Sequence, residues 1–285
     1  QLARRPREYR LQKAARMNRI RIIAVVFLAL TFSAVLLADF VAPAPYAKQF
    51  REAPNAPPSA KHLLGTDDLG RDAFSRLLYG SRVSLLLAPA AALLSTLIAA
   101  CVGGLAGYLG GWFERAALVA TDLSLSLPWL FLLLTVRALL PLNIAPIASV
   151  TITFALLGVL GWSSSGRVIC SGARAIRRSD FVLQAQALGC PSHRLFFKQV
   201  LPNLQPILSA QFWTSIPIFI IAEANLGVLG LGVSEPLPSW GNLLRGLENW
   251  PEVKAGPWKL MPIVLLVAVV SCFQLVFQKR ENQAS

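Results

Sequence analysis

The sequence predicts an all-α membrane protein with six transmembrane helices. Of its 285 residues, 55% are hydrophobic and only 14% are charged, whereas soluble domains carry about a quarter charged residues. Long runs without a charge recur along the chain, and each is close to or above the length that a helix needs to cross a bilayer. In so apolar a chain, a net charge of +13 indicates the cytoplasmic face of a membrane protein rather than a nucleic-acid surface.

The N-terminal part precedes the main transmembrane region. Residues 1–21 are a tail with eight basic residues, and residues 22–42 hold the first transmembrane helix. A basic tail before an apolar run also resembles a cleaved secretory signal, but the later apolar runs favour a retained anchor. Residues 43–82 are expected to be an external loop, because its first half is rich in proline. Its second half, with Thr66 or Asp67 as a cap, predicts an amphipathic helix at the membrane surface.

The transmembrane core, residues 83–280, holds the other five expected spans and an external loop at 233–259, and a cytoplasmic tail follows at 281–285. These spans are expected at 83–113, 116–136, 138–166, 204–230 and 260–278. If the N-terminus is cytoplasmic, 17 of the 27 basic residues lie in cytoplasmic segments and 10 in external ones. Because cytoplasmic loops are enriched in Lys and Arg, both termini are expected to lie in the cytoplasm.

A polar stretch between the fourth and fifth spans, residues 179–203, carries its own helix signals. A serine and an aspartate at its start can cap a first short helix, and Gly189 stands where that helix must end. A second helix is expected to begin near Pro191 and to stop at Pro202, which lacks a backbone donor. Short isolated helices are marginal in water, so this cytoplasmic helix-turn-helix needs a partner that covers it.

Metal sites are disfavoured by residue spacing. Cys170, Cys190 and His193 include no paired ligand spacing, so reduced and packed thiols are the favoured interpretation. Three aspartates at positions 67, 68 and 72 do not follow the order of an EF-hand loop, which favours helix capping and surface roles over calcium binding.

The stretch 179–203 resembles the EAA loop of ABC importer permeases. That pattern is a Glu-Ala-Ala followed by a Gly and, thirteen residues after the Gly, the proline of a Leu-Pro pair. Here Gly189 is followed at that distance by Leu201 and Pro202. The chain departs from the pattern at the Glu-Ala-Ala, because these three positions hold Leu183, Gln184 and Ala185.

Two further segments narrow the resemblance to the second permease subunit of dipeptide, oligopeptide and nickel importers. The segment before the second span in that family resembles residues 65–85, GTDDLGRDAFSRLLYGSRVSL. The stretch that leaves its fifth span resembles residues 222–244, AEANLGVLGLGVSEPLPSWGNLL. Only the C-terminal FQLVFQKRENQ departs visibly from the family.

The resemblance implies a multi-pass inner-membrane permease that forms half of the path for a peptide or a similar small solute. Its implied partners are the lipid bilayer, a second permease subunit, two ATP-binding subunits and an external solute-binding protein, with no nucleic acid. The chain has no Walker A motif, so ATP is expected on the partners, and no cofactor or catalytic residue is expected here. The implied ATPase-coupling residues are Asp180, Ala185, Gly189, Leu195, Phe196, Leu201 and Pro202. Four apolar side chains are expected to act as anchors in a partner groove: Phe181, Leu188, Leu195 and Phe196.

Charges in the apolar runs are candidates for the translocation path. An acidic side chain near the bilayer centre costs about 2.5 to 3.5 kcal/mol, so Glu223 and Asp122 should face protein or water. Glu223 and Asn225 are expected to line the translocation path. The alternative for Glu223 is a hydrogen bond to a neighbouring subunit. For Asp122, a structural role is the favoured interpretation.

Three other functions fit parts of the sequence. An ion-coupled secondary transporter would use Glu223 and Asp122, but the two halves show no visible repeat. An intramembrane enzyme is disfavoured because His62 and His193 both lie outside the spans. A DNA-binding helix-turn-helix is disfavoured by its tether between two spans.

Overall fold

The computed structural model describes residues 5–139, 145–248 and 256–277, which form helices, turns and two isolated β-bridges. Five helices in these residues are long and apolar enough to cross a membrane, and a bent pair can form a sixth span. The all-α transmembrane fold is therefore confirmed. The chain divides into two compact units, residues 1–82 with 238–285 and residues 83–237.

The first unit brings together both ends of the chain. Phe32 and Phe273 meet edge to face, with ring centroids 6.4 Å apart. Trp240 is fully buried, and its Nε1 donates to Ser81 Oγ at 2.9 Å. Ser239 and Asn242 form a capping box at the start of the Trp240 helix. The elements of this unit are α1 (Arg5–Leu36), α2 (Ala38–Val41), the start of α3 (Ala73–Ala99), α12 (Trp240–Arg245), η3 (Gly246–Glu248), η4 (Pro257–Leu260) and α14 (Met261–Phe277).

The expected amphipathic surface helix begins later than the sequence predicts. Residues 43–72 form turns held by bridges between Gln49 and Arg71 and between Thr66 and Asp72. The helix starts at Ala73 and continues without a break as α3, the second span. Asp72, rather than Thr66 or Asp67, caps it, because its Oδ1 accepts from the Ser75 backbone N–H at 2.7 Å.

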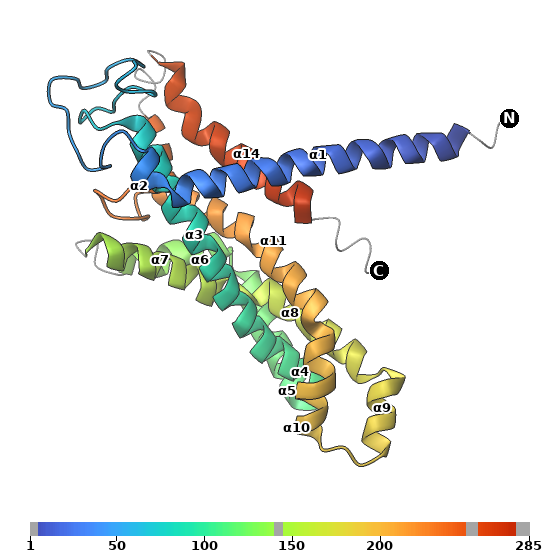
Figure 1. The fold of residues 1–285 in the computed structure, drawn as a ribbon. Helices are drawn as coiled ribbons and strands as arrows, with labels where there is room; N and C mark the ends of the chain where they lie inside the picture. The colour runs from blue at the N-terminus through green and yellow to red at the C-terminus, as the bar shows by residue number, and fades with distance from the viewer. Residues whose placement is uncertain (1–4, 140–144, 249–255, 278–285) are drawn as a thin grey trace. The chain divides into compact units, whose positions relative to one another are not determined.

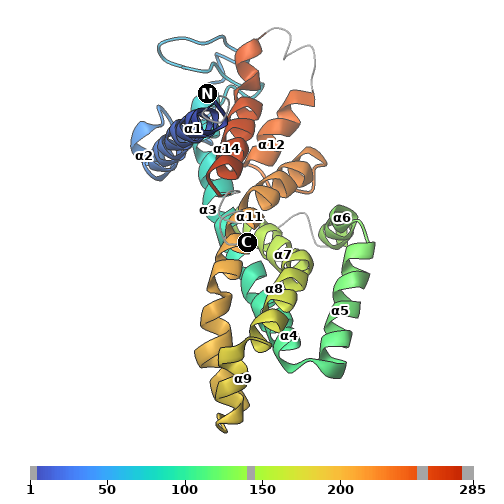
Figure 2. The ribbon, with the colours of Figure 1, turned by 90° about the vertical axis from the view of Figure 1, so that its right-hand side faces the viewer.

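The second unit holds the helices that surround the candidate site. The short helices α9 and α10 lie at the opposite end of this unit from α6 and α7 (Figures 1 and 2). Its elements are the rest of α3, η1 (Ala100–Gly104), α4 (Leu105–Leu109), α5 (Gly111–Ser126), α6 (Trp129–Leu139), α7 (Pro146–Leu160), α8 (Trp162–Arg177), α9 (Asp180–Ala187), α10 (Ser192–Leu195), η2 (Phe196–Val200) and α11 (Leu201–Val228).

The expected third span, 116–136, is not one helix. α5 and α6 meet at an angle of 81°. Leu127 between them is extended, with φ −84° and ψ 132°, because the ring of Pro128 disfavours a helical conformation in the residue before it. The prediction of a single continuous helix was therefore wrong. The expected turn between the third and fourth spans falls mostly on residues 140–144, outside the described residues.

Close backbone packing fixes the orientation of α8. A Cβ atom on Gly103 would lie 2.3 Å from the Gly166 carbonyl oxygen, and one on Gly107 would lie 2.2 Å from the Cys170 carbonyl oxygen. Only glycine permits these approaches. The small-residue side of α8, which includes the buried Ala173, therefore faces η1 and α4.

Candidate coupling site

The helix α9 ends where the sequence predicts. Gly189 has φ +80°, in the left-handed region that glycine adopts readily. Its N–H donates to the Gln186 carbonyl at 3.0 Å, and the Cys190 N–H donates to the Ala185 carbonyl at 3.1 Å. This pair of bonds is a Schellman motif. A Cβ atom on Gly189 would meet no atom within 4 Å, so the requirement for glycine is conformational and not steric.

The start of α9 differs in detail from the expected cap. Ser179 stands at the N-cap position with an extended backbone. Its hydroxyl donates to the Ile176 carbonyl at 2.5 Å and accepts no backbone N–H of α9. Asp180 lies in the first turn and is exposed, where a negative charge is favourable to the helix dipole.

The second helix does not stop at Pro202, so that prediction was wrong. α10, η2 and α11 follow one another as a single 37-residue span, Ser192–Val228. Pro202 cannot donate to the carbonyl one turn earlier, and its ring crowds that carbonyl. The π-helical turn η2 ends at Val200, two residues before the proline, and widens the helix there.

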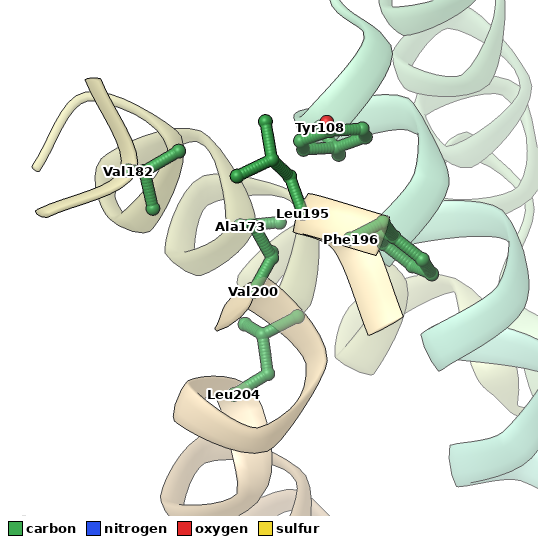
Figure 3. Close-up of a cluster of buried hydrophobic side chains, with 7 residues drawn as sticks. All are labelled: Tyr108, Ala173, Val182, Leu195, Phe196, Val200 and Leu204. Carbon is green, nitrogen blue, oxygen red and sulfur yellow. The ribbon is translucent and has the colours of Figure 1, made fainter. Parts of the chain in front are cut away.

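A buried apolar cluster fixes the two short helices to the rest of the second unit. Its side chains come from α4, α8, α9 and the continuous helix that starts at α10, as Figure 3 shows. The Tyr108 hydroxyl also donates to the Ser192 carbonyl at 2.8 Å, which ties α4 to α10. The cluster consists of Tyr108, Ala173, Val182, Leu195, Phe196, Val200 and Leu204.

Leu195 and Phe196 do not have the exposed position that partner anchors need. Both are buried in the cluster of their own chain, because the helix continues into α11 and turns this face inward. Ala185 is half-buried and packs against the same cluster. Leu201 is half-buried and Pro202 is exposed.

The exposed apolar residues of α9 and its C-terminal cap are Phe181, Leu183 and Leu188, the last with 88% of its surface accessible. Sequence reasoning identified Phe181 and Leu188 but missed Leu183, which occupies the position of the family's glutamate. Phe197 in η2 is a further exposed aromatic residue that it missed. The signal was the same in both cases: a large apolar side chain in a polar stretch.

The structure does not bring the two predicted path residues together. Glu223 is fully buried in α11, and its Oε2 accepts from Ser84 Oγ of α3 at 3.0 Å. Asn225 is exposed. Two helical positions differ by about 200° around the axis, so these side chains leave α11 on different sides. The hydrogen bond between Ser84 and Glu223 joins α3 and α11 of the same chain.

Asp122 forms an ion pair with Arg167 of α8, with 3.0 Å between Oδ1 and Nη1. Arg174, two turns further along α8, pairs with Glu114 of α5. These two contacts join α5 to α8. Both partners of the Asp122 pair nevertheless stay about half exposed.

Arg137 lies between the expected third and fourth spans, where it counts among the ten external basic residues, but its side chain is buried. Its Nη2 donates to Ser149 Oγ at 2.9 Å and to the Gly232 carbonyl at 3.4 Å. Because this arginine is buried and hydrogen-bonded within the protein, it should not be counted as a loop charge when the membrane orientation is inferred. Within the described residues, no group of three or more His, Cys, Asp or Glu is placed to hold a metal ion.

The chain is similar in sequence to a transport family and to several bacterial permeases. A family model described as "Binding-protein-dependent transport system inner membrane component" matches residues 99–281. The chain is 31% identical over 241 residues to the dipeptide transport system permease protein DppC of Bacillus subtilis (strain 168), covering 85% of this chain and 73% of that protein. It is 30% identical over 246 residues to the oligopeptide transport system permease protein OppC of the same organism, covering 86% and 78%. OppC of Mycobacterium tuberculosis (strain CDC 1551 / Oshkosh) is 33% identical over 220 residues, covering 77% and 74%.

Proposed function

The chain belongs to the family of binding-protein-dependent transport system inner membrane components and is a permease subunit of an ABC importer; from this premise we propose that it carries peptides and is driven through α9. Family membership overturns the alternative of an ion-coupled secondary transporter. The names of the similar permeases support dipeptides or oligopeptides as the solute.

The exposed apolar side chains of α9 carry the proposal. A helix of eight residues that shows Phe181 and Leu183 to its surroundings is unfavourable in water unless a partner covers it. α9 packs against α4, α8 and α11 through the buried cluster, so a force on α9 would move these helices with it. We propose that an ATP-binding subunit covers α9 and that its nucleotide-driven movement is passed to these helices.

The proposed assembly places α9 and both termini in the cytoplasm. One copy of this chain pairs with a second permease subunit, and each permease receives one ATP-binding subunit. An external solute-binding protein delivers the peptide. In this arrangement ATP is bound and hydrolysed on the partners, and the chain itself holds no cofactor and performs no catalysis.

Reconstitution of the whole complex tests this function. The permease pair and both ATP-binding subunits are placed in liposomes with the binding protein, and uptake of radiolabelled dialanine is measured. We expect uptake that needs ATP and persists when ionophores collapse the ion gradients. Dialanine uptake that survives ATP depletion would refute ATP as the driving force. A complex in which neither dialanine nor any other small peptide tested is transported or competes for ATP-driven transport would refute peptides as the solute.

A further inference from the structure

The helix α8 exposes polar side chains along one side. Ser164, Arg167 and Ser171 are exposed, and Arg174 keeps 41% of its side chain accessible. Their spacing of three or four residues places them on a single stripe of the helix, named here the α8 polar stripe. The small-residue side of α8, which packs against η1 and α4, lies about 110° away around the helix axis.

The neighbouring helix α5 separates its exposed side chains by chemistry. Trp112, Val119 and Leu123 form an exposed apolar side that suits lipid. Asp122 and Glu114 instead lie toward α8, where they pair with Arg167 and Arg174. The two helices thus expose a joint polar surface next to an apolar one.

The pair of Asp122 and Arg167 lies two to three helical turns inside α5 and α8, away from the charged residues near their ends. Asp122 is eight residues, about 12 Å along the axis, from Glu114 near the start of α5. Arg167 is ten residues, about 15 Å, from the end of α8 at Arg177. The hydrocarbon core of a bilayer is about 30 Å thick. The side chains of Asp122 and Arg167 are 52% and 56% exposed, and charged groups within candidate membrane spans face water or protein rather than lipid.

We infer that the α8 polar stripe and Asp122 line the solute path, and that Arg167 and Asp122 bind the carboxylate and ammonium ends of a peptide in transit. This inference rests on the proposed function. A peptide is a zwitterion, and an exposed arginine beside an exposed aspartate offers one opposite charge to each of its ends. The stripe also continues to Arg174 near the end of α8, as a path across the membrane requires.

Thiol accessibility in the complete complex tests the location. The four native cysteines are replaced by alanine, and Ser164→Cys, Ser171→Cys and the control Leu123→Cys are introduced singly. The probe is the charged, water-soluble reagent trimethylammonioethyl methanethiosulfonate. We expect both stripe cysteines to react at least tenfold faster than Leu123→Cys, and dialanine in millimolar excess to slow them at least threefold. Stripe cysteines that react no faster than the control, or that dialanine leaves unprotected, would place lipid or the second permease on this face and overturn the inference.

Neutralisation of the charges tests solute binding. Arg167→Gln, Asp122→Asn and the double variant should each lower dialanine uptake at least fivefold at equal membrane abundance. If the ion pair serves only folding, dialanine uptake should recover in the double variant, because that variant has no uncompensated charge. Such a recovery would overturn the inference. If a single variant fails to reach the membrane, the double variant and the thiol test decide. ATP-driven dialanine uptake by the unmodified complex, measured in parallel, distinguishes failure of this inference from failure of the proposed function.

Discussion

The consecutive helices α8 and α9 expose opposite kinds of side chain, and each is unsuited to the solvent expected around it. α8 belongs to a membrane span yet exposes Arg167 and two serines. α9 belongs to a polar connecting stretch yet exposes Phe181 and Leu183. Buried faces are fixed by packing within the chain, but exposed faces of the wrong polarity require another molecule. The comparison supports the proposals of a water-lined path beside α8 and of an ATP-binding subunit over α9.

The largest expected effect comes from a charge on the exposed side of α9. Leu188→Asp should lower copurification of the ATP-binding subunits and ATP-driven dialanine uptake at least tenfold, because a carboxylate would be desolvated in an apolar groove. Gln186→Asp adds the same charge at an exposed polar position of α9 and serves as the control. Equal retention of the ATP-binding subunits by both variants would contradict the docking role of Leu188.

A second substitution pair separates the buried side of this region from its exposed side. Leu195→Ala should lower the free energy of unfolding by about 2 to 5 kcal/mol, because it leaves a cavity in the cluster around Tyr108 and Phe196. The exposed Phe197→Ala should change it by about 0.5 kcal/mol or less. Thermal unfolding of the detergent-solubilised complex, followed by tryptophan fluorescence, measures both. A larger loss from Phe197→Ala would mean that Phe197 is covered within the chain.

A third substitution pair tests the turn between α9 and α10. Gly189→Val should destabilise the Schellman turn by about 1 to 2 kcal/mol, because a branched side chain is strained at φ +80°. Gly189→Asn should retain most of the function, since asparagine tolerates the left-handed region and no atom blocks its Cβ.

The readout for the Gly189 variants is the ratio of dialanine uptake to membrane-inserted protein. Loss of transport with normal insertion in Gly189→Val, and its retention in Gly189→Asn, would assign the effect to backbone conformation. Equal loss in both variants would indicate that the partner needs the bare glycine surface, and equal wild-type activity would remove the turn from the coupling mechanism.

Local signals predicted the parts of this region that depend on neighbours in sequence. Gly189 ends α9 because the left-handed turn is a property of a few consecutive residues. Pro202 failed as a stop signal because a widened turn in η2, held by the packing of Val200 and Phe196, accommodates the proline. Pro128, which sequence reasoning overlooked, breaks the expected third span at an angle of 81° between α5 and α6.

The sequence by itself determined the all-α transmembrane class, the family and the position of the helix-turn-helix, because hydrophobic run length, charge bias and turn residues are read along the chain. Only the tertiary structure decided which sides of these helices are exposed. Leu195 and Phe196 are buried in the core. Glu223 hydrogen-bonds Ser84 of the same chain, and Asp122 of α5 forms an ion pair with Arg167 of α8. The physical reason is that the rotation of a helix about its axis is set by packing against its neighbours, such as the close contact of Gly103 with Gly166, which no local pattern specifies.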